Sequence, residues 1–193
     1  MKQEIIEKWI QDAYGIAKTH GFHDEKQSDA HFLMLIVTEI SEAVEADRKG
    51  VKPRDMTIFE KACREYAGNQ DWEHFGFARA FEQHVKDCFE DELADIIIRC
   101  CDFLGRVNLT FAVSLSQKHW ESPFHHQYTR FTEEAWLWVQ ILNQDEYSSV
   151  GNVAGLLLTV CDYCDINDID IAQHVEWKMK YNKTRPKRHG KRY

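Results

Sequence analysis

The chain has 193 residues, 44% hydrophobic and 12% aromatic, so it can bury a packed core and is not a disordered polymer. Its net charge is −8, but the segment from Lys178 to Tyr193 holds eight Lys or Arg and no acid, which leaves −16 on the rest. The strong negative charge of residues 1–177 argues against general nucleic-acid binding. An acidic body with one basic end indicates multivalent cations and a phosphorylated ligand.

The sequence favours a cytoplasmic protein with no membrane partner. Its N-terminal residues mix charges from the start, and its longest apolar stretch, near residues 153–160, is far below the roughly 20 residues that cross a bilayer. Six cysteines suit a reducing compartment. Cys161 and Cys164 form a single CxxC without a second matching pair, so we expect core residues rather than a zinc or redox site.

Few helix breakers, three Pro and nine Gly, favour an all-α fold. In chain order, the first amphipathic pattern predicts a helix over residues 3–19, with Gly21 beyond its end. Ser28 is suited to cap a second helix that runs to about Arg48 and is closed by Gly50.

The middle of the chain predicts a short helix that starts with a capping box at Thr57 and ends near Gly68, then one long helix over residues 78–104 that stops at Gly105. Residues 106–128 are less regular, with Pro123 and a His125-His126 pair in an expected loop. Further helices are expected over residues 132–143, 149–164 and from Asp168 to about Arg185. We expect one all-α domain over residues 1–193, arranged as a helical bundle.

The second predicted helix places carboxylates beside its apolar face. At 100° per residue, Glu39 falls inside the stripe formed by Phe32 and Ala43, and Glu42 lies at its border. Glu45 points away, where it can pair with Arg48. A buried carboxylate is costly unless it is paired or metal-bound. A lone ExxE is nevertheless more often a solvated helix face.

The long helix repeats this arrangement. Glu92 lies within its apolar stripe and Asp95 at the edge, where a salt bridge from Asp95 to Arg99 is the alternative role. Packed against each other, the two helices would bring four carboxylates together, and these repel one another unless cations bind. Oxygen ligands without histidine suit Mg²⁺ or Mn²⁺ rather than zinc.

The last predicted helix carries Lys178, Asn182 and Arg185 at i, i+4 and i+7, on one face. A cation, an amide and a guanidinium together form a reasonable grip on a polyphosphate. Taken alone, this segment is better explained as a solubilising basic tail.

Together the three motifs resemble the MazG-like all-α nucleoside triphosphate pyrophosphohydrolases, whose pattern is ExxE, then ExxD, then a KMxxNxxR-type element. The likeness covers roughly half of the chain and implies a four-helix core. It implies Mg²⁺, with Mn²⁺ as a substitute, held by Glu39, Glu42, Glu92 and Asp95, and a triphosphate held by Lys178, Asn182, Arg185 and Arg99. It further implies hydrolysis of a (d)NTP to a (d)NMP and pyrophosphate, a house-cleaning or nucleotide-pool role, and a homodimer or homotetramer. Either Glu39 or Glu42 would orient the attacking water.

Two features depart from compact members of that family. Glu42 and Glu92 lie 50 residues apart, and residues 106–160 form a helical insertion by this comparison, as a lid, an oligomer surface or a substrate-selective element. Phe22 and His23 fall where the family carries base-contacting aromatics, although a core Phe and a surface His fit the sequence equally well.

Two rival functions stay open. A protein of the same fold could bind a nucleotide or a partner helix without catalysis, and metal-dependent turnover would separate this from an enzyme. An enzyme of this type could also cleave another pyrophosphate-containing substrate, such as a nucleotide sugar, which product identification would settle.

Overall fold

The computed structural model describes residues 1–190 apart from 53–55, 67–69, 108–129 and 145–147. Within these ranges it is all-helical, as the sequence predicts. The helices are α1 (Gln3–Thr19), α2 (Asp29–Lys49), α3 (Met56–Tyr66), α4 (Gln70–His84), α5 (Phe89–Arg106), α7 (Phe131–Leu142), α8 (Ser149–Ile166) and α9 (Ile171–Thr184). None of the described helices combines the length and the apolar character that a bilayer span requires.

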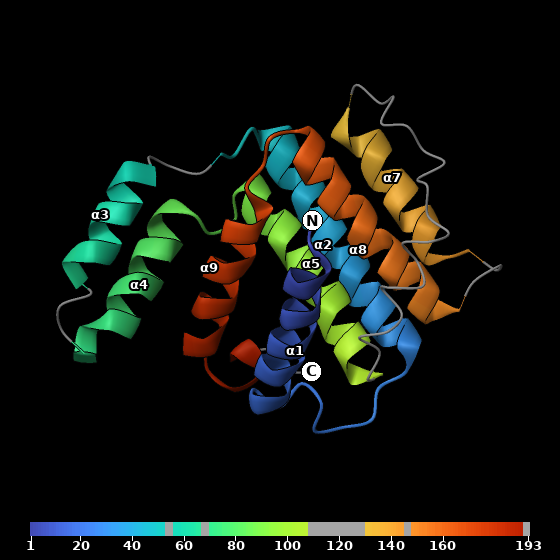
Figure 1. Ribbon diagram of the computed structural model, residues 1–193, viewed down its shortest axis with the longest axis horizontal. Helices are drawn as coiled ribbons and strands as arrows, with labels where there is room; N and C mark the ends of the chain where they lie inside the picture. Colours follow the sequence, from blue (N-terminus) through green and yellow to red (C-terminus); the bar gives the residue numbers. More distant parts are fainter. Residues whose placement is uncertain (53–55, 67–69, 108–129, 145–147, 191–193) are drawn as a thin grey trace.

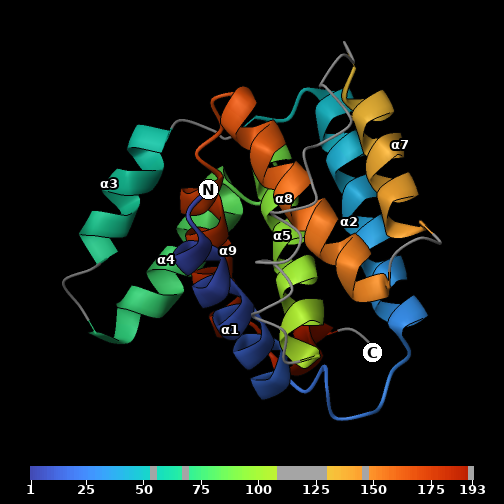
Figure 2. The same ribbon diagram turned by 45° about the vertical axis from the view of Figure 1, so that its right-hand side comes forward.

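Helix α5 is the centre of the bundle (Figures 1 and 2). It packs against α1, α2, α8 and α9, and α7 covers α2 and α8. The shared core contains large side chains such as Trp9, Ile36, Phe103 and Trp138, each at most 1% exposed. Cys161 and Cys164 lie in this core as free thiols, as expected.

The helix ends at α2 follow the capping chemistry of the sequence. The hydroxyl oxygen of Ser28 accepts a hydrogen bond from His31 N, and Gly50 adopts φ 64° at the other end. Such left-handed backbone is open to glycine because it has no Cβ. On the outer face, Glu45 pairs with Arg48 at 2.5 Å, which confirms the predicted phase of this helix.

The predicted single helix over residues 78–104 is wrong. The chain instead forms α4, breaks at residues 85–88 and restarts as α5; residues 70–77, for which no helix is predicted, belong to α4. At the break Asp87 has φ 63° and Cys88 is extended. Asp87 N donates to Asp91 Oδ2 at 3.0 Å, so an α5 side chain stabilises the break. Residues 85–88 contain neither Gly nor Pro, so the sequence pattern predicts one continuous helix across the break.

Two segments differ in how they join the core. The described part of the expected insertion at residues 106–160 contributes α7 and most of α8, whose apolar side chains belong to the main core. Helices α3 and α4 lie to one side (Figure 1) and share a smaller cluster that includes Phe59, Phe81 and Tyr181. Pro123, His125 and His126 lie outside the described residues.

Helix α5 runs through Gly105 rather than stopping there, and close packing explains the glycine. A Cβ at Gly105 would overlap Tyr14 Cβ and lie 3.0 Å from Ile10 O, both on α1. Gly15, on the exposed side of α1, has nothing within 4 Å of the same position.

We therefore expect opposite effects from two glycine substitutions. Gly105→Ala should lower the free energy of unfolding by about 1–3 kcal/mol, because overpacking at the α1–α5 contact outweighs the better helix propensity of Ala. Gly15→Ala should raise it by about 0.5–1 kcal/mol, because only propensity changes. Urea unfolding of both variants measures this, and equal gains in stability would contradict the close approach.

Candidate metal and phosphate site

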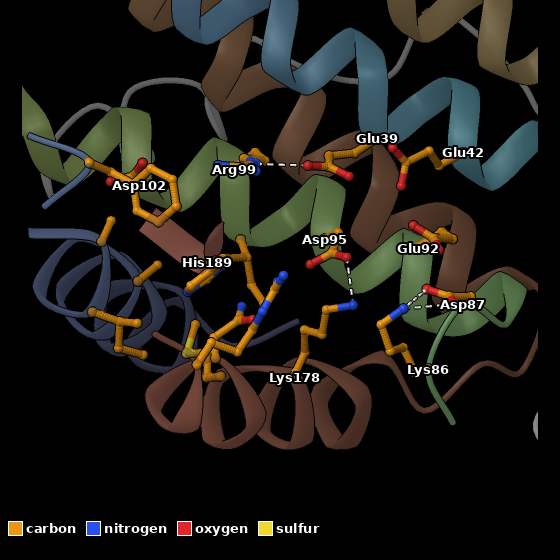
Figure 3. A pocket seen from close by; sticks show the side chains of 18 residues that line it. Glu39, Glu42, Lys86, Asp87, Glu92, Asp95, Arg99, Asp102, Lys178 and His189 are labelled. Carbon is orange, nitrogen blue, oxygen red and sulfur yellow. Dashed lines mark hydrogen bonds and ion pairs between the residues drawn. The ribbon is translucent and has the colours of Figure 1, made fainter. Parts of the chain in front are cut away.

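The break before α5 places a carboxylate-rich turn at the centre of the bundle. Glu90, Asp91 and Glu92 occupy the first turn of α5, where the positive end of the helix dipole favours negative charge. Asp95 follows one turn later, and α2 brings Glu39 alongside (Figure 3). Glu39, Glu92 and Asp95 each offer an oxygen atom within 4.8 Å of the other two. Three of the four predicted metal ligands therefore converge.

Glu42, the fourth predicted ligand, takes a different position. It is exposed and lies outside this group of three. It lines a pocket that Glu39, Glu92 and Asp95 also line. Its charge contributes to raising the pKa of both Glu39 and Glu92. It therefore acts on the cluster from the open side.

Their surroundings raise the pKa values of two carboxyl groups in this cluster, Glu92 and Glu39. Burial is the main cause that raises the pKa of Glu92 to about 8, and the nearby charge of Asp95 adds to it. Burial and Asp95 likewise raise the pKa of Glu39, against the opposing effect of Arg99. Both residues are less than 7% exposed, so the cluster is costly to ionise without a cation.

Lys178 lies between two acids of α5. Its Nζ is 2.6 Å from Asp91 Oδ2 and 2.6 Å from Asp95 Oδ2, and the lysine is 4% exposed. Burial disfavours its charge, but Asp95 and Asp91 together outweigh burial and raise its pKa. The basic motif on α9 is thus partly neutralised by these two acids.

Asp91 is a site residue that the motifs missed. It is 0% exposed, and burial raises its pKa to about 6 although Lys178 opposes the shift. The signal was present in the sequence, because Asp91 lies four residues before Asp95 and shares its helix face.

Arg99 pairs across the helices rather than along its own helix. Its Nε donates to Glu39 Oε1 at 2.8 Å, and its guanidinium lies 6.0 Å from the Phe22 ring centroid. The alternative role of Asp95, a salt bridge to Arg99, is not what the structure shows, since Asp95 pairs with Lys178. Arg99 still lines the pocket, so it can orient Glu39 and face a ligand.

Asn182 and Arg185 line the pocket with Lys178, so the third motif converges on the carboxylates. The prediction that Arg185 shares one helical face with Lys178 and Asn182 is only partly correct. Helix α9 ends at Thr184, and Arg185 is the extended residue after it. Its guanidinium lies 5.7 Å from the Tyr181 ring centroid.

Phe22 lines the pocket, but His23 is held away from it. His23 Nε2 lies 2.7 Å from Asp102 Oδ1, and the imidazole stacks on Phe32 with ring centroids 5.5 Å apart. With an 11% exposed side chain, His23 is not a surface residue, and its partners favour a structural role over base contact.

The donor set fits a hard divalent cation. All converging atoms are carboxylate oxygens, and within the described residues Glu92 Oε2 is buried without a hydrogen-bond partner. An orphaned buried oxygen is costly, and coordination would satisfy it.

Searches of protein-family models, curated proteins and solved structures found no match to this chain. The likeness to MazG-like enzymes therefore rests on the three sequence motifs.

We expect the metal-free protein to lose stability as the pH rises from about 4.5 to about 8, since a group whose pKa is raised on folding stabilises only while protonated. Glu92→Gln should remove most of this loss and stabilise the metal-free protein at pH 8 by on the order of 2 kcal/mol. Urea unfolding in chelator between pH 5 and 9 tests it, with exposed Glu45→Gln as the control. Identical pH profiles for wild type and Glu92→Gln would contradict the raised pKa.

Proposed function

We propose that this chain is a divalent-metal-dependent nucleoside triphosphate pyrophosphohydrolase. The observation that carries the proposal is the convergence of Glu39, Glu92 and Asp95 in one pocket with Asn182 and Arg185. Oxygen ligands beside a phosphate-binding amide and guanidinium suit phosphoryl transfer, which depends on positioning and charge neutralisation.

Glu39, Glu92 and Asp95 would hold the metal, with Glu42 at the edge, and Mg²⁺ or Mn²⁺ suits their oxygens. Such a cation would supply charge neutralisation at the phosphoryl group and acidify a bound water. We assign the orientation of the attacking water to Glu42 rather than Glu39. Glu39 is committed through Oε1 to Arg99, whereas Glu42 is exposed on the open side of the same pocket.

The remaining polar residues position the substrate. Arg185 and Asn182 face the pocket from the end of α9, where they would bind phosphate oxygens. Asp91 anchors Lys178 beside the carboxylates at 2.6 Å, so the ammonium would stay next to the metal ligands and neutralise charge that develops on the phosphates.

One observation favours a second function, in which the protein binds nucleotides without catalysis. Lys178 already neutralises Asp91 and Asp95, so an internal cation stabilises part of the cluster. A sensor could keep the cluster for this structural purpose. The cations that pair within the cluster, Lys178 and Arg99, are outnumbered by its carboxylates, and this excess of acid supports the metal-dependent enzyme; the carboxylates are Glu39, Glu42, Asp91, Glu92 and Asp95.

A panel of NTPs and dNTPs with Mg²⁺ tests the enzyme directly. We expect pyrophosphate and a nucleoside monophosphate as products, no turnover in chelator, and losses of orders of magnitude in kcat for Glu39→Gln, Glu42→Gln, Glu92→Gln and Asp95→Asn. Glu45→Gln should leave kcat unchanged, because it lies on the opposite face of α2 and pairs with Arg48. Orthophosphate as the only primary product would exclude the assignment, and binding without turnover would favour the sensor.

Arg185 gives a separate test of the phosphate grip. Arg185→Ala should raise KM by roughly tenfold or more, since a charge-assisted hydrogen bond to phosphate contributes about 1.5–3 kcal/mol. Arg185→Lys should recover only part of this, because an ammonium lacks the bidentate fork. Exposed Lys183→Ala, on the same end of α9, is the matched control. Unchanged KM and kcat in Arg185→Ala at low ionic strength would remove the third motif from the site.

A further inference from the structure

After Pro186 the chain remains in contact with the rest of the protein. Residues 187–190, the C-terminal turn, fold back onto the loop that follows α1. Arg188 N donates to His20 O at 2.8 Å, and the Arg188 guanidinium donates to Gly21 O at 3.3 Å and Glu25 Oε1 at 3.0 Å. Lys187 pairs with Asp24 at 2.7 Å. Lys187 and Arg188 therefore each have an acidic partner on this loop.

The receiving loop is shaped for this contact. Gly21 has φ 79°, and a Cβ there would overlap the Lys187 side chain. The positive φ is the stronger reason for glycine, because the lysine stem is flexible. The acidic pair Asp24 and Glu25 then matches the two cations of the turn in charge.

The turn also fixes His189. Arg188 and His189 both have left-handed backbone, at φ 51° and 50°, which non-glycine residues rarely adopt. Contacts of the turn hold this conformation. The His189 ring lies edge-on to Phe22 with centroids 5.1 Å apart and to His20 at 5.3 Å.

His189 lines the same pocket as the carboxylates but toward its other end. In Figure 3, His189 lies toward one end of the view and Glu42 and Glu92 toward the other. Beside His189 the lining includes the aromatic ring of Phe22 and the aliphatic side chains of Ile16 and Met179, together with the polar Asp102 and Arg99. The pocket therefore offers an aromatic and aliphatic surface away from Glu42 and Glu92. A flat heteroaromatic ring suits such a surface, and an imidazole adds one directional hydrogen bond.

We propose that the C-terminal turn forms the wall of a nucleobase subsite, in which His189 and Phe22 contact the base and Arg188 positions His189. The assignment rests on the proposed function for the identity of the ligand as a nucleotide. It makes His189 a specificity-determining residue and gives Arg188 a purely positioning role.

The test compares His189→Ala and Arg188→Ala with Arg48→Ala, a control that also removes a surface arginine paired with a glutamate. Across four NTPs, His189→Ala should change the ratio of kcat/KM between the best and worst base by about tenfold or more. Arg188→Ala should raise KM for the best substrate several-fold while kcat changes little. His189→Gln should restore part of the base preference, since an amide keeps a hydrogen-bonding edge.

A second measurement does not need turnover. Binding of free nucleosides to the metal-free protein, followed by NMR, should weaken in His189→Ala and stay unchanged in Arg48→Ala. If no NTP is hydrolysed but this loss is seen, the proposed enzyme fails while the base subsite holds. If NTPs are hydrolysed with the same base ratios and nucleoside binding in His189→Ala as in wild type, the subsite is overturned and the enzyme stands. Neither turnover nor nucleoside binding in wild type would overturn both.

Discussion

Lys178 Nζ lies 2.6 Å from carboxylate oxygens of both Asp91 and Asp95, and this buried double ion pair ties α9 to the central helix. Its removal would leave two acids beside Glu39 and Glu92 with less compensation, because the other cation paired within the cluster is the partly exposed Arg99. Breaking such a pair costs more than forming it gains, since the remaining charge stays buried. The position of α9 also sets where Arg185 meets the pocket and where the C-terminal turn begins.

The sequence predicts much of the fold because local signals and tertiary packing agree. Ser28 and Gly50 bound α2 as predicted, and the phase that turned Glu45 outward also turned Glu39 inward. The break between α4 and α5 could not be read, because Asp87 adopts its left-handed backbone without a Gly or Pro. Its stabilising bond, from Asp87 N to Asp91, depends on a carboxylate whose position is set by tertiary packing.

Most residues of the candidate site could be predicted from the sequence, but the ion pairs between them could not. Helical phase identified Glu39, Glu92 and Asp95, yet the partner that it offered for Arg99 as an alternative was Asp95, one turn away on the same helix. The structure pairs Arg99 with Glu39, 60 residues away, and gives Asp95 to Lys178. A periodic pattern reports which face a side chain occupies and carries no information on which helix packs against that face. The ion pairs of the C-terminal turn could not be predicted for the same reason, because its acidic partners follow α1 at the other end of the chain.

The pairing has a consequence for how the site would accept a cation. Asp95 is shared, since it contacts Lys178 and also belongs to the group of Glu39 and Glu92. Asp91 is not in that group of three, and it keeps Lys178 through its own ion pair and accepts a hydrogen bond from Asp87 N. If the proposed metal binds, Asp95 would turn from the ammonium toward it while Asp91 retains the lysine. The lysine would then lie beside the metal with part of its hydrogen-bonding capacity released toward the pocket, which is where a phosphate oxygen would accept it. Lys178 is therefore an anchored cation, and Asp91, which lies outside the three motifs, anchors it.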